Sequence, residues 1–221
     1  SGNTVVFKPA SDTPATATKL VEILLEAGVP PKVINLVHGT GSTVGVPMVE
    51  HPDIDVIAFT GSVPVGKSIS EGCGRTLKRV SLELGGKNAQ IVMNDANLEV
   101  ALDGILWGAF GTTGQRCTAT SRLILQEGIH DRFVDMLVEA TKKLKLGDGL
   151  LPSTDVGPLI NEKAREKVHR YVQIGKDEGA RLITGGEFAT DGELSRGWFY
   201  KPTIFVDVKP GMRIEQEEIF G

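Results

Sequence analysis

The chain is poor in cysteine and in aromatic residues, and it has no long apolar run. It has 221 residues, of which two are cysteines, two tryptophans and two tyrosines, and aromatic residues make up 5%. Two cysteines are too few for the disulfide framework of a small secreted domain, so we expect reduced thiols and a cytoplasmic protein. The apolar runs break off before the length of a membrane span, and we expect neither a membrane partner nor a signal peptide.

The chain also lacks an excess of one charge. Lysine and arginine number 24 against 28 aspartate and glutamate residues, which gives a net charge of -4. This balance does not favour nucleic acid or an anionic membrane surface as a partner. None of the four histidines stands at ligand spacing from another histidine or a cysteine, so we predict no metal site. They are His38, His51, His130 and His169.

The first 90 residues alternate between strand-like and helical patterns. Strands are expected at 4–10, 34–39, 56–61 and 78–86, and helices at 13–28, 42–51 and 63–72. Thr13 is placed as the N-cap of its helix, Pro14 lies in its first turn and Gly28 stands at its end. Strand–helix alternation with short connections predicts an α/β fold with a parallel sheet and right-handed crossovers.

The second part of the chain has a different pattern. Strands are expected at 88–93, 121–127, 180–186 and 199–208, and helices at 97–111, 131–145 and 161–180. The change falls at the Gly85–Gly86 pair, so we divide the chain into residues 1–85 and 86–221. A parallel sheet of only the first strands would have a bare edge, which leads us to expect a fragment or a truncated form.

Two glycine-containing segments follow predicted strands. GTGSTVG (39–45) does not match the dinucleotide fingerprint G-x-G-x-x-G, because one residue too many precedes the third glycine, and a plain strand-to-helix turn explains it equally well. FTGSVPVG (59–66) has glycine and serine at the start of a helix, where backbone N–H groups can hold a phosphate. Ser62 can equally act only as the N-cap of that helix.

Two further segments have candidate catalytic side chains. In LELGGKN (82–88), Glu83 ends an otherwise apolar strand. Apolar surroundings would raise its pKa and suit a general base, whereas an ion pair with Lys78 or Lys87 is the structural alternative. In GQRCT (114–118), Cys117 lies in a loop that can expose the sulfur and offer it backbone N–H groups. The alternative is a buried, inert cysteine, which is our expectation for Cys73.

Taken together, FKPA, FTGSVPVG, LELGGKN, GQRCT and EEIFG resemble the NAD(P)-dependent aldehyde dehydrogenase superfamily, in this order and over essentially the whole chain. The resemblance implies part of a Rossmann-like dinucleotide-binding domain in residues 1–85 and part of an α/β catalytic domain in residues 86–221. The fold would be truncated at both ends relative to the family.

The resemblance also implies roles for individual residues. Cys117 matches the nucleophile that forms a thioester, and Glu83 matches the base that activates the hydrolytic water. Glu218 matches the carboxylate on the nicotinamide ribose, and Phe220 matches the aromatic residue beside the nicotinamide ring. The remaining positions implied to bind cofactor are Lys8, Ser11, Gly41, Gly45, Phe59, Gly61, Ser62, Gly66 and Leu84.

The sequence departs from the family pattern at Ser11. Many NAD-specific members have a glutamate three residues after the lysine that corresponds to Lys8, and a carboxylate there would repel a 2′-phosphate. A serine hydroxyl can instead donate a hydrogen bond to that phosphate, so we expect NADP to be accepted as well as NAD.

The expected reaction is oxidation of an aldehyde to a carboxylate. The segment around Cys117 resembles enzymes that act on semialdehydes, such as 2-oxoglutarate semialdehyde, and Arg116 or Arg122 can pair with a substrate carboxylate or serve the structure. A homo-oligomer is implied for the full-length family. The alternative is a catalytically impaired fragment that retains only cofactor binding or an assembly role. Acyl transfer to coenzyme A is disfavoured because Glu83 is retained.

Overall fold

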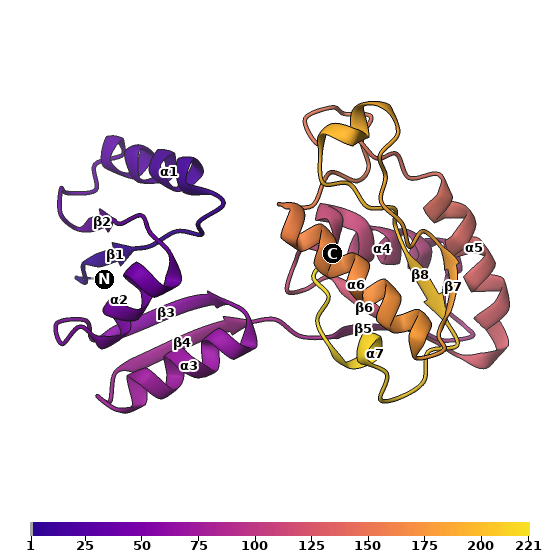
Figure 1. The fold of residues 1–221 in the computed structure, drawn as a ribbon, viewed down its shortest axis with the longest axis horizontal. Coiled ribbons are helices and arrows are strands. Elements are labelled where there is room, and N and C mark those ends of the chain that lie inside the picture. The colour runs from indigo at the N-terminus through magenta and orange to yellow at the C-terminus, as the bar shows by residue number, and fades with distance from the viewer. Residues whose placement is uncertain (1) are drawn as a thin grey trace. The chain divides into compact units, whose positions relative to one another are not determined.

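The computed structural model describes residues 2–221, which divide into two compact units. The first unit ends at Leu84, and the second is Gly85–Gly221. The division falls one residue before the boundary between 85 and 86 that the sequence pattern suggested. Figure 1 shows both units, and each is described by itself.

The first unit has the predicted order of strands and helices, although most of its strands are shorter. Its elements are β1 (Val5–Phe7), α1 (Pro14–Glu26), β2 (Ile34–Leu36), α2 (Val46–Glu50), β3 (Val56–Gly61), α3 (Val63–Gly74) and β4 (Arg79–Leu84). The residues predicted as one helix at 42–51 instead form a π-helical turn, Gly41–Gly45, followed by α2. Thr40 and Thr43 cap this turn reciprocally through their hydroxyl groups and backbone N–H groups.

Helix α1 begins and ends where its sequence signals place it. Pro14 occupies its first turn, and Gly28 lies just beyond its end with φ +96°, a left-handed conformation that favours glycine. Thr13 stands at the N-cap, but its side chain makes no capping hydrogen bond. Ala17 and Val21 are the buried residues of the helix.

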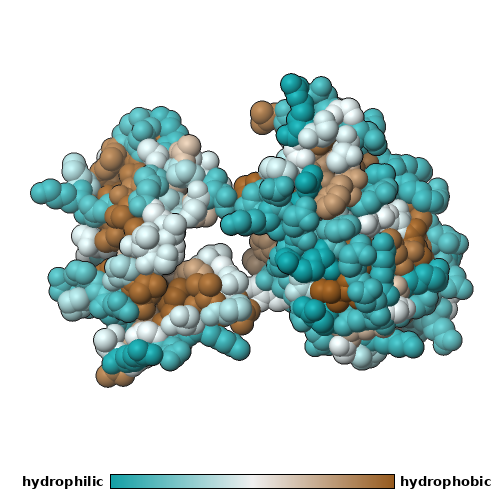
Figure 2. All heavy atoms as spheres, in the orientation of Figure 1, coloured by the Kyte–Doolittle hydropathy of each residue, from teal (hydrophilic) through white to brown (hydrophobic). Residues whose placement is uncertain are grey.

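The four strands of the first unit form two separate parallel pairs rather than one continuous sheet. β1 pairs with β2, and β3 pairs with β4, each in regular register. Apolar strand residues remain exposed, with Val5 at 47% and Val56 at 53%. In Figure 2, brown apolar patches are visible on this unit, at the left of the view. The sequence pattern predicts parallel direction correctly, but strand neighbours are set by tertiary packing.

The second unit has one parallel and one antiparallel strand pair, with helices around them (Figure 1). β5 pairs with β6 in parallel, and β7 pairs with β8 antiparallel. Its elements are β5 (Asn88–Val92), α4 (Leu98–Phe110), β6 (Thr120–Leu125), α5 (His130–Lys142), α6 (Glu162–Asp177), β7 (Arg181–Thr184), β8 (Ile204–Val206) and α7 (Arg213–Gln216).

Two apolar clusters hold the second unit together. The first joins β5, α4 and α5, and its buried residues are Val92, Ile105, Ile129, Phe133 and Leu137. The second lies around α6, and its buried residues are Leu159, Val168, Val172 and Tyr200. Leu123 and Leu125 of β6 are partly buried against the first cluster, so the loop between α4 and β6 has both ends anchored. Over residues 2–221 the structure has no helix with the length and apolar character that crossing a membrane requires.

Candidate functional site

The loop between α4 and β6 contains Cys117 and has an unusual backbone. It opens with a tight helical turn, Gly111–Gly114, in which Thr112 and Thr113 have φ values of 55° and 58°. Left-handed backbone is unfavourable for β-branched residues and is typical of functional sites. Cys117 is exposed as a free thiol, whereas Cys73 in α3 is free and completely buried.

Side chains of the loop itself hold it in place. The Arg116 guanidinium lies 4.0 Å from the centre of the Trp107 ring and donates through Nη2 to the Trp107 carbonyl at 2.9 Å. Gln115 accepts from the Ile160 N–H through Oε1 at 3.0 Å. Thr113 donates through Oγ1 to the Gly157 carbonyl at 3.0 Å. These contacts hold the part of the loop that precedes Cys117.

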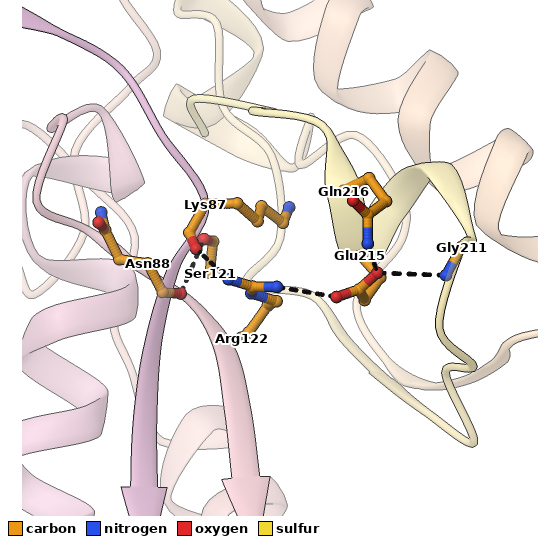
Figure 3. Close-up of polar contacts among 7 residues, drawn as sticks. All are labelled: Lys87, Asn88, Ser121, Arg122, Gly211, Glu215 and Gln216. Atoms are coloured by element: carbon orange, nitrogen blue, oxygen red, sulfur yellow. Dashed lines mark hydrogen bonds and ion pairs between the residues drawn. The ribbon is translucent and has the colours of Figure 1, made fainter.

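Asn88 holds the backbone at Cys117. Its Nδ2 donates to the Cys117 carbonyl at 2.6 Å and to the Ala119 carbonyl at 3.1 Å. Ser121 in turn donates through Oγ to the Asn88 carbonyl at 3.1 Å (Figure 3). Asn88 is the last residue of the LELGGKN segment, so the segment that follows Glu83 directly contacts the cysteine loop. We did not predict a role for Asn88 from the sequence.

The last residues of the chain also reach this site. A Cβ atom built on Gly85 would collide with the Glu218 carboxylate, so Glu218 lies directly over the backbone of that glycine. Gly114 has φ +68°, and a Cβ atom there would lie 3.0 Å from the carbonyl carbon of Gly221. Segments from LELGGKN, GQRCT and EEIFG are therefore side by side within the second unit. Phe220 is 43% exposed, and its backbone has a left-handed conformation with φ 64°.

Glu217 and Glu218 are consecutive but have different surroundings. Glu217 accepts from Arg213 through both carboxylate oxygens, at 2.9 and 3.0 Å, and from the Tyr171 hydroxyl at 2.6 Å. The Arg213 hydrogen bonds first, and then that of Tyr171, lower the pKa of Glu217 to about 2. Glu217 is thus an anchor of the segment, and Glu218 remains directed at Gly85.

Lys87 lies among charged groups at the start of β5. Burial, followed by the nearby Arg122 guanidinium, lowers the pKa of Lys87 to about 8. The carboxylates of Glu215, Glu217 and Glu218 oppose this shift, because they favour the charged amine. Figure 3 shows Lys87 directly before β5 and Arg122 on the neighbouring strand β6, with Arg122 directed at Glu215.

Glu83 lies in the first unit, near the end of β4 and opposite Thr60 of β3. Its side chain is exposed, so the apolar surroundings that we expected from the sequence are not present in this unit. Polar and apolar residues alternate along β4, and Glu83 lies on the same exposed face as Arg79 and Ser81. Lys78 donates to the carbonyls of Val49 and His51 rather than to Glu83.

The predicted cofactor residues of the first unit occupy turns and helix ends. Ser62 is the N-cap of α3, but its hydroxyl makes no capping hydrogen bond. Gly66 faces Leu84, which is 2.6 Å from the position of an added Cβ, and Gly61 lies against the Phe59 ring. Lys8 donates to the carbonyls of Pro9, at 2.6 Å, and Gly39, at 3.4 Å. Ser11 lies in an exposed turn, and Gly41 and Gly45 bound the π-helical turn.

The N-terminus of α3 is suited to the phosphate groups of a nucleotide. The N-terminus of α3 has a serine hydroxyl not used for capping, and helix N-termini attract phosphate groups through their N–H groups. Among residues 2–221 no cluster of three or more histidine, cysteine, aspartate or glutamate side chains is arranged to hold a metal ion.

Comparison with known proteins agrees with this geometry. The family model described as aldehyde dehydrogenase family matches residues 1–221, and the chain therefore belongs to the aldehyde dehydrogenase family. It is 48% identical to betaine aldehyde dehydrogenase of Bacillus subtilis (strain 168) over 221 residues, which are all of this chain and 45% of the relative. It is 44% identical to alpha-ketoglutaric semialdehyde dehydrogenase of the same organism, with the same coverage of both chains.

A solved structure has the same fold. Betaine aldehyde dehydrogenase from Staphylococcus aureus in complex with NAD+ superimposes with a TM-score of 0.96 and 39% sequence identity, over 99% of this chain and 43% of that one. The fold is thus the aldehyde dehydrogenase fold, as the five motifs indicated. The chain spans less than half the length of these relatives.

Proposed function

We propose that this chain oxidises an aldehyde to a carboxylate with NAD or NADP, through a thioester on Cys117. The observation that carries the proposal is the meeting of three segments around one exposed thiol. Asn88 is bound to the Cys117 carbonyl, Glu218 lies over Gly85, and Gly114 lies against Gly221. The sequence has one other cysteine, Cys73, and it is not available for this role because it is buried.

The chemistry follows from the two catalytic residues. The Cys117 thiolate attacks the aldehyde carbonyl carbon, and a thiohemiacetal forms on the sulfur. A bound nicotinamide would supply the acceptor for a hydride from that carbon, and loss of the hydride from the tetrahedral adduct would leave a thioester on Cys117. Glu83 would take a proton from a water molecule whose oxygen attacks the thioester carbon. The C–S bond then breaks, the Cys117 thiolate leaves, and the released acid ionises to the carboxylate.

The residues at the nicotinamide end belong to the second unit. Glu218 would hold the nicotinamide ribose through its hydroxyl groups, and Phe220 would lie beside the ring. Glu217 supports this assignment, because its bonds to Arg213 and Tyr171 hold the adjacent backbone in place. In this assignment residues 86–221 are part of a catalytic domain.

The adenosine end would be bound by residues 1–85 as part of a dinucleotide-binding domain. Lys8 and Ser11 would bind the adenosine ribose, and Ser62 with the N-terminus of α3 would bind the pyrophosphate. Six further residues would shape the nucleotide site: Gly41, Gly45, Phe59, Gly61, Gly66 and Leu84. Because Ser11 has no negative charge, we propose that NADP is accepted. Ser11→Glu should weaken NADP selectively, and equal loss of both cofactors would contradict this assignment.

For the substrate, we propose a semialdehyde, as the segment around Cys117 suggests. The similarity to alpha-ketoglutaric semialdehyde dehydrogenase supports this choice, and betaine aldehyde is the competing substrate suggested by the other relatives. Arg116 and Arg122 do not support a carboxylate-binding role, because Arg116 donates to backbone carbonyls and Arg122 pairs with Glu215. We further propose a homo-oligomer, which light scattering of the purified chain would test.

The deciding experiment follows reduced nicotinamide during steady-state turnover with NAD or NADP and a panel of semialdehydes and other aldehydes. Cys117→Ser should abolish turnover, and Cys73→Ser is the matched control that leaves the reactive thiol in place. Trapping the thioester and locating it on Cys117 by mass spectrometry would support the covalent step. Cofactor binding without turnover would favour the alternative, an impaired fragment of a dehydrogenase.

A further inference from the structure

A charged cluster lies beside the proposed nicotinamide site and has no role in the reaction described above. Arg122 is on β6, five residues after Cys117, and Glu215 is on α7, three residues before Glu218. The Arg122 guanidinium donates through Nη1 to Glu215 Oε1 at 2.8 Å and through Nη2 to the Lys87 carbonyl at 2.6 Å (Figure 3). One side chain therefore joins three segments that are far apart in the sequence.

The pair is shielded from solvent more than most ion pairs in the chain. The side chains of Arg122 and Glu215 are 35% and 20% exposed, whereas those of the Arg196–Glu193 pair are 78% and 85% exposed. Shielded, charge-assisted hydrogen bonds hold geometry better than exposed ones, which are screened by water and salt.

The strand geometry directs Arg122 to this position. In the pairing of β5 with β6, Asn88 is opposite Thr120 and Ala89 is opposite Arg122, so Ser121 is an extra residue on β6. Such an irregularity changes the direction of the side chains that follow it. The same irregularity places Ser121 against Asn88, which holds the Cys117 backbone.

Glu215 in turn holds the segment that precedes the cofactor residues. Besides Arg122, it accepts from the Gly211 N–H through Oε2 at 3.3 Å and from the Gln216 side chain. Glu215 thus joins the turn before α7, at Gly211, to Arg122 of β6. The residues two to five positions after it include Glu217, Glu218 and Phe220.

We infer that Arg122 and Glu215 are positioning residues that fix the segment with Glu218 and Phe220 relative to the strand that follows Cys117. This inference rests on the proposed function, because it assigns Glu218 and Phe220 to the cofactor. It also gives Arg122 a role different from binding a substrate carboxylate. Neither residue touches a reacting atom, so the effect of their removal is on cofactor geometry and not on the reactivity of the thiol.

The test uses the 221-residue chain and the variants Glu215→Gln, Arg122→Lys and the double variant. Hydrogen exchange of residues 211–221 is measured by mass spectrometry, NAD and NADP affinity by titration, and Cys117 reactivity by iodoacetamide labelling. Glu193→Gln, which removes the exposed pair with Arg196, is the matched control. All variants are first compared by circular dichroism, and those that do not fold are replaced by Glu215→Asp.

We expect Glu215→Gln to speed exchange in 211–221 and to weaken cofactor binding by about tenfold, with labelling of Cys117 within about twofold of wild type. Arg122→Lys keeps the charge but loses the two guanidinium donors that bind separate acceptors, so its effect should be intermediate. The loss of cofactor affinity in the double variant should be smaller than the sum of the losses in the two single variants. The control should change none of the three measurements.

Two other results would overturn the inference. Unchanged exchange and unchanged cofactor affinity would show that the Arg122–Glu215 contact positions nothing. A rise in KM for a semialdehyde, with cofactor affinity unchanged, would assign Arg122 to the substrate. If the wild-type chain binds no dinucleotide while Cys117 is labelled normally, the proposed function itself fails, and the exchange measurement alone still reports whether the contact holds 211–221.

Discussion

Asn88 donates a hydrogen bond of 2.6 Å from its side-chain amide to the Cys117 carbonyl. The same amide nitrogen reaches the Ala119 carbonyl, so one side chain binds the backbone on both sides of Thr118. The proposed nucleophile is therefore held from the segment that also contains the proposed base, Glu83, five residues earlier. Asn88 and Cys117, which are 29 residues apart in the sequence, are thus in direct contact within the second unit.

Asn88→Asp should destabilise the second unit more than Asn88→Ala does. The carboxylate would face two carbonyl oxygens that now accept a hydrogen bond, whereas alanine only leaves them without this donor. Loss of the donor should lower the free energy of unfolding by about 1–3 kcal/mol. Chemical denaturation of both variants measures this, and equal stability of Asn88→Asp and wild type would show that the amide donor has no role.

Gly85→Ala should displace Glu218 and weaken cofactor binding with little change in overall stability. The added methyl group would meet the Glu218 carboxylate, which is the movable end of a flexible side chain. Loss of a charged hydrogen-bond acceptor at the ribose should weaken cofactor affinity by about tenfold. Gly86→Ala is the matched control, because its Cβ would have only the Asn88 side-chain oxygen within 4.0 Å. Equal effects of both substitutions would place Glu218 outside the cofactor site.

Stability should rise with pH above about 8 through the titration of Lys87. Its pKa is lowered from 10.5 to about 8, by burial first and then by Arg122, so between these values the unfolded chain binds the proton and the folded chain does not. The full difference corresponds to about 3 kcal/mol, and solvent screening at a partly exposed amine reduces that figure.

Lys87→Met should remove this pH dependence. The gain in its free energy of unfolding over wild type should be larger at pH 7 than at pH 10. Denaturation curves of wild type and variant at a series of pH values measure the difference. An identical pH dependence of both proteins would show that Lys87 keeps an ordinary pKa.

Glu217 should contribute to stability above its ordinary pKa and lose that contribution in acid. Its pKa is lowered to about 2, first by the Arg213 hydrogen bonds and then by that of Tyr171. The contribution is complete above about 4.5 and is lost as the pH falls from 4.5 towards 2. In Arg213→Ala the pKa of Glu217, followed by NMR, should move towards 4.5, and Tyr171→Phe should have a smaller effect. A pKa unchanged in Arg213→Ala would contradict the assignment.

Much of the local structure could be predicted from the sequence, because short-range signals determine it. Pro14 and Gly28 mark the ends of α1, and the alternation of strands and helices indicates parallel pairs. The five motifs indicated the family, and the family model matches the chain. The loop position of Cys117 left either an exposed or a buried thiol open, and the structure shows it exposed.

Long-range contacts could not be predicted in this way, because no local pattern specifies a partner 30 to 90 residues away. The sequence alone left Arg122 with either a structural or a substrate role, and only tertiary packing brings it to Glu215, 93 residues later. The apolar strand around Glu83 suggested a buried carboxylate, yet the side chain lies on an open face. Residue types and periodicity thus determined the elements, and the five motifs carried the resemblance to the family. The approach of Glu218 to Gly85, and of Asn88 to Cys117, depended on how the elements pack.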